Sequence, residues 1–271
     1  MKQNNKALSP EHAKYIKKSK KYKYLVIGLQ IGLLILFLGL WELLTYLMIV
    51  DPLFISSPSR MISTIIELIE QNNLFHHIFT TLFEAMLGFV IATGLGFIIA
   101  IILWCSKLIR NVLEPYIVIL NALPKIALGP IIIIWFGVGT KSIVVMAILI
   151  LIIVTILSLL SAFLSCDKAK IQLMESFGAN KWQILTKLVI PNSMPEFISV
   201  LKINVGLTWV GTIMGEYLVS KAGLGYLIVY GGAVFKLDLV MASTLILCLL
   251  AGLMYFLVVW LEKWYSKRHT N

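Results

Sequence analysis

The residues of this chain that could do chemistry are a few charged side chains inside long apolar segments. Lys125 lies between Pro124 and Pro130, and Glu216 follows closely spaced glycines near the end of another apolar segment. A charge inside a membrane is costly, so each is a candidate for a place on a substrate or ion pathway. Prolines break helices, and broken helices are tolerated where backbone lines a cavity. We therefore expect the segment around Lys125 to border a translocation path.

The predicted path residues combine polar groups, helix breaks and one large aromatic ring. They are Asn121, Pro124, Lys125, Gly129, Trp209 and Glu216. For Lys125, attraction of an anion, a structural ion pair and snorkelling toward the membrane surface all stay open. For Trp209, packing is favoured over lining the path. Lys202 and Asn204 lie near the cytoplasmic end of their segment and are expected to snorkel toward the membrane surface. Lys202 cannot pair with Glu216 in the same chain, because the two are ~21 Å apart along a helix that rises ~1.5 Å per residue.

Groups suited to catalysis or metal binding are few. The histidines His12, His76, His77 and His269 lie outside the apolar segments, and we expect His76 and His77 to be solvated. The three cysteines have no metal-ligand spacing and are expected to be small apolar fillers. The stretch 137–142 superficially resembles a phosphate-binding loop but lacks an adjacent Gly-Lys pair. We expect no enzyme activity, no catalytic residue, no metal site and no cofactor bound by this chain.

Composition places the chain in a membrane. Of its 271 residues, 59% are hydrophobic and 13% charged, whereas soluble domains have about 45–50% and about 25%. The net charge of +10 arises partly from eight lysines that precede the first apolar segment. Such a cluster is typical of a cytoplasmic flank beside anionic lipid, so the charge does not indicate nucleic-acid binding.

Six apolar segments are long enough to cross the bilayer, which takes about 20 helical residues. They are Leu25–Val50, Leu82–Trp104, Tyr116–Phe136, Ile143–Leu164, Phe197–Leu218 and Leu239–Leu261. No segment alternates polar and apolar residues as membrane barrels do, so we predict an all-α membrane protein with about six transmembrane helices. Gly211 and Gly215 have the small-xxx-small spacing that permits close contact between helices.

Charge also predicts the orientation. With the N-terminus inside the cell, 17 of the 23 Lys and Arg residues fall in inside segments and four in outside segments. We therefore expect both termini to be cytoplasmic in a multi-pass protein of the cell membrane. The predicted organisation is a basic tail at 1–24, a transmembrane domain at 25–264 and a tail at 265–271.

The inside loop at residues 165–196 has two short helical phases. The first, about Lys168–Phe177, ends at Gly178, and the second, about Asn180–Val189, starts at Asn180 as N-cap and stops before Pro191. Spacing places four apolar residues of the second phase on one face: Trp182, Leu185, Leu188 and Val189. Such a helix pair could rest on its own bundle or on a partner, and both readings stay open.

The stretch GANKWQILTKLVIPNSMP at 178–195 resembles the EAA loop of ABC-importer permeases, in which a Gly precedes a hydrophobic-x-Pro by about a dozen residues. Segments 40–44, 55–60, 121–139 and 223–228 are similar, in order, to segments of nitrate/sulfonate/taurine-type permeases. Thiamine-precursor and riboflavin importers have similar subunits. The resemblance implies an ATPase-coupling loop, and its residues here are Gln172, Glu175, Gly178, Ala179, Asn180, Lys181 and Pro191. Gln172 stands where the family has Glu, and Glu175 is displaced from that position by three residues.

The resemblance also implies the fold and the partners. The fold would be that of a type I ABC importer, like the methionine importer, and the chain would form the path for a nitrate-, sulfonate- or taurine-like solute or a vitamin precursor. A second copy of the chain, two ATPase subunits holding ATP and Mg, an extracellular solute-binding protein and the lipid bilayer would be its partners. A secondary transporter driven by an ion gradient is the alternative, although such proteins often have paired broken helices and only one broken segment is evident here.

Overall fold

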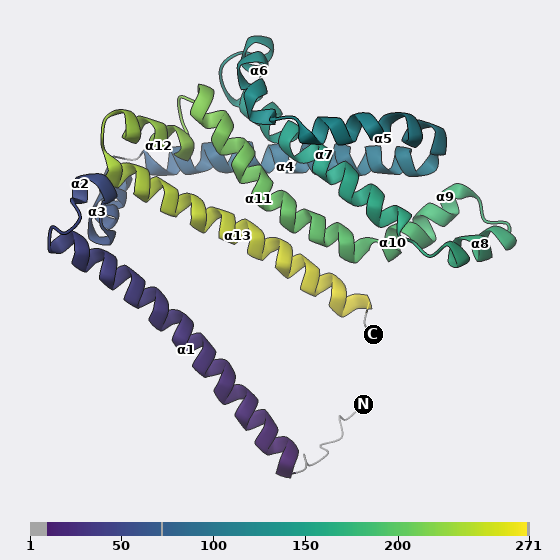
Figure 1. The fold of residues 1–271 in the computed structure, drawn as a ribbon, viewed down its shortest axis with the longest axis horizontal. Coiled ribbons are helices and arrows are strands. Elements are labelled where there is room, and N and C mark those ends of the chain that lie inside the picture. The colour runs from purple at the N-terminus through teal and green to yellow at the C-terminus, as the bar shows by residue number, and fades with distance from the viewer. Residues whose placement is uncertain (1–9, 72, 270–271) are drawn as a thin grey trace. The chain divides into compact units, whose positions relative to one another are not determined.

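The computed structural model describes residues 10–71 and 73–269, and every regular element in these ranges is helical (Figure 1). The predicted fold class, an all-α membrane protein, is therefore confirmed. Contacts divide the chain into two units, residues 1–63 and 64–271. Helix runs into both predicted tails, and residues 1–9 and 270–271 of those tails lie outside the described residues.

The first unit holds a long helix, α1 (Pro10–Tyr46), a short helix, α2 (Pro52–Ile55), and the start of α3 (Pro58–Glu70). The apolar part of α1, Lys21–Tyr46, has the length and composition of a membrane-spanning helix. The Glu42 carboxylate accepts from the Ser59 backbone N–H at 3.1 Å and from its hydroxyl at 2.7 Å. Glu42 therefore satisfies the N-terminus of α3, where negative charge is favourable.

The second unit contains the remaining helices. They are α4 (Leu74–Cys105), α5 (Lys107–Ala122), the 3-10 turn η1 (Lys125–Leu128), α6 (Gly129–Phe136), α7 (Thr140–Leu164), α8 (Lys168–Ser176), α9 (Lys181–Ile184), the π-helical turn η2 (Leu185–Val189), α10 (Ile190–Asn192), α11 (Met194–Val219), α12 (Leu224–Ala233) and α13 (Leu237–His269). Helices α1, α4, α7, α11 and α13 are long and apolar enough to cross a membrane. The α5–α6 pair is a sixth candidate, bent by 88°.

The bent pair differs from the predicted segment Tyr116–Phe136 at its start. Helix α5 begins at Lys107, because the Ser106 hydroxyl accepts from the Ile109 N–H and caps the helix. It ends where Leu123 adopts an extended conformation before Pro124, a position from which proline excludes helix. The predicted break around Lys125 is therefore present, although the helical part before it is longer than expected.

Helix α7 lies at the centre of the second unit, and glycines bring its neighbours unusually close. A Cβ atom added at Gly211 of α11 would lie 2.7 Å from the Ala147 Cα, and one at Gly215 would lie 2.9 Å from the Ile143 Cα. The predicted close contact at these two glycines is confirmed. Helix α4 approaches the other side of α7 in the same way, since a Cβ at Gly96 would lie 2.7 Å from the Thr155 Cγ2.

Asn204 joins the same three helices and overturns the prediction that it snorkels. Its side chain is fully buried, and its Nδ2 donates to the Thr93 Oγ1 of α4 at 3.1 Å and to the Thr155 Oγ1 of α7 at 2.9 Å. Amide hydrogen bonds between helices hold membrane bundles together where water is absent. Asn204 lies well inside α11 and faces the packed interior, so snorkelling to the membrane surface is not needed.

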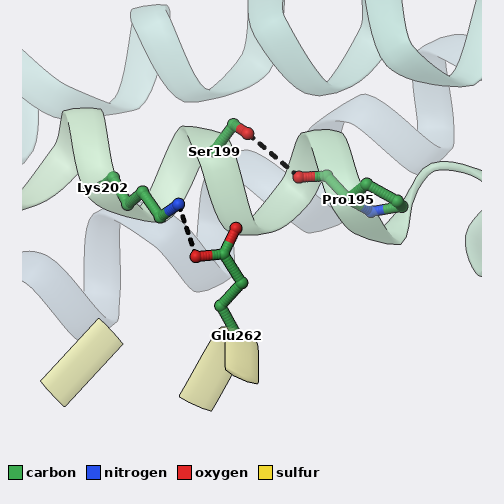
Figure 2. A network of polar contacts seen from close by, with 4 residues as sticks. All are labelled: Pro195, Ser199, Lys202 and Glu262. Carbon is green, nitrogen blue, oxygen red and sulfur yellow. Dashed lines mark hydrogen bonds and ion pairs between the residues drawn. The ribbon is translucent and has the colours of Figure 1, made fainter. Parts of the chain in front are cut away.

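Lys202 likewise has a partner where snorkelling alone was expected. Its Nζ lies 2.6 Å from the Glu262 Oε2, so an ion pair ties α11 to α13 (Figure 2). One turn earlier, the Ser199 hydroxyl donates to the Pro195 carbonyl at 3.1 Å (Figure 2). The pair had no signal in the sequence, because Lys202 and Glu262 are distant along the chain.

Candidate functional site

The 165–196 loop contains the break that the sequence predicts at Gly178. The Asp167 side chain caps α8 by accepting from the Ala169 N–H at 2.9 Å. Gly178 has φ of +77°, and the next N–H, that of Ala179, donates to the Met174 carbonyl at 3.0 Å. Glycine adopts this left-handed conformation without steric cost and commonly ends helices. A side chain at Gly178 would point into open space.

Asn180 begins the second phase as predicted. Its Oδ1 accepts from the Gln183 N–H at 2.8 Å, and the Gln183 Oε1 accepts from the Asn180 N–H at 2.9 Å, which forms a capping box. The predicted stop before Pro191 is wrong, because Pro191 lies in the first turn of α10. The Ile190 N–H donates to the Leu185 carbonyl, a π-type bond. This wider turn lets the chain continue helically into a proline that cannot donate.

One face of the loop rests on the chain's own bundle. Ile184, Leu185 and Val189 are buried in a cluster with Phe163 of α7 and Val200 of α11. This arrangement decides between the two readings left open for that face. The cluster holds the loop against the ends of two membrane helices.

Two polar groups strengthen the same junction. The buried Ser193 hydroxyl contacts the Ala162 carbonyl of α7 at 3.2 Å and the Val189 carbonyl at 2.7 Å. Cys166 is buried in the cluster, and burial raises the pKa of its thiol, so it stays protonated and packs as a small apolar group, as predicted.

The opposite face of the loop is exposed and partly apolar. Leu173, Phe177 and Trp182 are 57%, 82% and 63% exposed, and they flank the open Gly178. The prediction that Trp182 shares the buried face is wrong, because the π-helical turn follows Trp182 and changes the helical phase. Six predicted loop residues are exposed and Ala179 is half-buried; the six are Gln172, Glu175, Gly178, Asn180, Lys181 and Pro191.

The predicted path residues are only partly brought together. Lys125 donates from Nζ to the Asn121 carbonyl at 3.2 Å and to its Oδ1 at 3.4 Å, beside the exposed Pro124. Within the described residues, Lys125 has no carboxylate partner. Gly129 is buried against the side chains of Leu218 and Met146. Its small size thus serves the packing of α6.

Trp209 and Glu216 both lie in the interior of the second unit. Trp209 belongs to a core cluster between α4, α11, α12 and α13, which is the packing role that its sequence context favours. Glu216 is 1% exposed, and its Oε2 accepts from the Gly225 N–H at 2.5 Å. Glu216 therefore contacts the start of α12, and Lys125 contacts Asn121.

Sequence reasoning missed a clasp around the N-terminus of α12. The Gly223 N–H donates to the His77 Nδ1 at 2.9 Å, and the Leu224 N–H donates to the Thr81 Oγ1 at 2.7 Å. The Gly225 N–H donates to the Glu216 Oε2. The first N–H groups of a helix have no partner within the helix, and here three of them are satisfied by side chains of α4 and α11. The expectation that His77 is solvated is wrong. Its ring also stacks on the ring of Tyr226, with 6.0 Å between the two ring centroids.

The two glycines of this clasp explain its local sequence. Gly223 has φ of +116°, and a Cβ there would lie 2.5 Å from the Glu216 Cδ. A Cβ at Gly225 would lie 2.7 Å from the Glu216 Oε2. Both positions must lack a side chain for the carboxyl group to reach the backbone. The GLG at 223–225 was the signal available in the sequence, although only as part of a resemblance.

Comparison with known proteins gives one family. Residues 92–271 match the model of the binding-protein-dependent transport system inner membrane component. A probable ABC transporter permease of Haemophilus influenzae is 34% identical over 69% of this chain and 77% of its own length. The taurine transport system permease TauC of Escherichia coli is 26% identical over 84% of this chain and 85% of its own. The riboflavin transport system permease RibX of Chloroflexus aurantiacus is 27% identical over 92% of this chain and 92% of its own length.

A solved structure supports the fold. The MetNI methionine ABC transporter in an inward-facing conformation has a chain that superposes with a TM-score of 0.59, over 71% of this chain and 94% of its own. The identity is 18%, so this likeness concerns the fold. The predicted likeness to the methionine importer and to taurine and riboflavin permeases is confirmed.

A glycine pair on α12 tests the clasp. Gly225→Ala should lower the free energy of unfolding by about 1–3 kcal/mol, because the new methyl overlaps the Glu216 carboxyl group. Gly232→Ala, on the same helix but with open space around it, should be neutral or stabilise by up to about 1 kcal/mol. Thermal unfolding of the purified chain in detergent measures both. Equal stability of the two variants would contradict the clasp.

Proposed function

Since the chain belongs to the family of binding-protein-dependent transport system inner membrane components, and is a membrane-spanning permease subunit of an ATP-binding-cassette importer, we propose that its 165–196 loop docks on a separate ATPase. The observation that carries the proposal is the two-sided loop. One side packs into the bundle, and the other presents Leu173, Phe177 and Trp182 around an open Gly178.

The exposed apolar side chains favour a protein partner. Large exposed apolar groups rimmed by polar residues mark interaction sites, and aromatic residues are enriched at the anchors of interfaces. The polar residues Gln172, Glu175 and Lys181 border these side chains. Because Gln172 is neutral, it would contact the ATPase by shape and ordinary hydrogen bonds, without the added strength of a charged partner.

The packed side of the loop supports a mechanical role. Ile184, Leu185 and Val189 lie against α7 and α11, and Ser193 bonds to α7. A displacement of the loop would therefore displace those helices as a rigid body, which is how packed elements switch between states. In this proposal, closure of two ATPase subunits on ATP and Mg drives two copies of the permease between inward-facing and outward-facing states. The permease itself binds no nucleotide.

The proposed setting is the cell membrane with both termini in the cytoplasm. Lys168, Lys170, Lys181 and Lys187 belong to the loop that would face the cytoplasm, as the positive-inside tendency favours. Helix α12 lies at the end of the second unit opposite this loop (Figure 1). An extracellular solute-binding protein would then deliver the solute at the α12 end.

The proposed solute is a small molecule with an anionic sulfonate group, such as an alkyl sulfonate or taurine, in preference to a vitamin precursor. Lys125 lies at the break of an apolar helix, and its only partners among the described residues are two oxygens of Asn121. A lysine without a carboxylate partner keeps its charge available to an anion. The relative named for taurine transport agrees with this solute class.

A loop glycine tests the docking. Gly178→Arg should abolish ATP-driven uptake and co-purification of the ATPase, because a long charged side chain would fill the docking surface. Gly137→Arg is the matched control, since Gly137 also has positive φ, of +81°, and open space around it. The control should keep the ATPase bound. Retention of the ATPase by Gly178→Arg at the wild-type level would contradict the proposed docking.

Lys125 tests the solute class. In proteoliposomes with the ATPase and binding protein, Lys125→Ala should raise the KM for taurine about tenfold or more, because a hydrogen bond to a charged group contributes about 1.5–3 kcal/mol. Lys141→Ala, a loss of the same charge at the exposed start of α7, should leave KM unchanged. An unchanged KM for Lys125→Ala would remove this residue from the path.

A further inference from the structure

Two buried carboxyl groups meet beside the α12 clasp. Glu84 of α4 and Glu216 of α11 are each 1% exposed, and the two carboxyl groups lie close enough to interact electrostatically. In the part of the chain that the structure describes, no lysine or arginine pairs with either carboxyl group.

Two carboxyl groups buried side by side favour holding one proton between them. An ionised carboxylate only accepts hydrogen bonds, so a bond between the two groups forms only when one of them carries a hydrogen. Two buried carboxylates without a cation would also repel each other and lack solvation. One oxygen of each group, Glu84 Oε2 and Glu216 Oε1, is buried with no partner among the described residues. A bound proton would remove the repulsion between the two groups, and the unpartnered oxygens could bind it.

We propose that Glu84 and Glu216 form a proton-binding site whose single proton keeps the start of α12 fastened to α4 and α11. The link to α12 is direct, because Glu216 uses its Oε2 to hold the Gly225 N–H. Loss of the proton would leave both Glu84 and Glu216 negatively charged beside each other. The carboxyl groups would separate, and Glu216 would leave α12.

A cavity gives the proton a route to the pair. It has a volume of about 260 Å³ and is lined by Glu84, Thr80, Thr140, Ser220 and Lys221, among others. Glu84 lines this cavity and has a buried, unpartnered carboxyl oxygen, which distinguishes the site from an ordinary cluster of acidic residues. Calling this side extracellular rests on the proposed function, whereas the proton site itself does not.

Other titratable groups near the clasp respond differently to pH. They are His76 and His77 on α4, Lys141 on α7, Tyr217 on α11, Lys221 in the following turn, and Tyr226 and Tyr230 on α12. His77 accepts a hydrogen bond through Nδ1, so its protonation would weaken the clasp as pH falls. Lysine and tyrosine ordinarily titrate near pH 10. A loss of stability as pH rises, at pH values below those at which lysine and tyrosine titrate, is therefore the mark of the carboxyl pair.

The test measures thermal unfolding and infrared absorption of the purified full chain in detergent between about pH 6 and pH 9. The wild type should lose stability as pH rises, by up to tenfold in the unfolding equilibrium constant per pH unit, because the folded state holds one proton that the unfolded state releases. Glu84→Gln/Glu216→Gln keeps a neutral hydrogen-bonding pair and should not show this loss. Glu67→Gln, which changes an exposed carboxylate, should follow the wild type.

The infrared spectrum keeps the test informative if the double variant does not fold. The wild type at neutral pH should show the C=O band of a protonated carboxyl group, and the band should disappear as pH rises and in each single variant, Glu84→Gln and Glu216→Gln. A missing band in the wild type, or its persistence in both single variants, would overturn the proposal. So would stabilisation of the wild type by Na⁺ or Ca²⁺ at fixed pH that the double variant lacks. No transport, ATPase or solute is involved, so failure here is distinct from failure of the proposed function.

Discussion

The close approach of α7 to α4 and α11 is the constraint on which the second unit depends. Lipid and leucine are equally apolar, so helices in a bilayer gain little from hydrophobic burial and rely on tight packing and hydrogen bonds. Gly96 and Gly211 provide the packing, since neither position has room for a Cβ. Asn204 provides the hydrogen bonds by donating to Thr93 and Thr155. These contacts make three helices into one body that can be moved from its ends.

The two ends of this three-helix body make different contacts. At one end, Leu185 and Val189 pack the 165–196 loop against it, while Phe177 stays exposed. At the other end, three side chains hold the start of α12, and Glu216 is shared between that clasp and the carboxyl pair. A load applied at the loop would thus reach the α12 end through packed helices, without a flexible link between them.

The sequence predicts the features that depend on residues close together in the chain. Composition and segment length predict the fold class, and glycine and asparagine chemistry predicts the turn at Gly178 and the cap at Asn180. The buried roles of Asn204 and His77 and the exposure of Trp182 were missed. Helices that are apolar all round give no sign of which face meets a neighbour, and contacts such as Asn204 with Thr93 join residues far apart in the chain.

The central claim is that this permease moves solute only when a separate ATPase acts on its loop. The most direct measurement is uptake into proteoliposomes that contain the permease with or without the ATPase, with the solute-binding protein outside and ATP and Mg inside. The account predicts uptake only when the ATPase and ATP are both present, and none from an imposed proton or sodium gradient. Gradient-driven uptake by the permease alone would contradict it and indicate a secondary transporter.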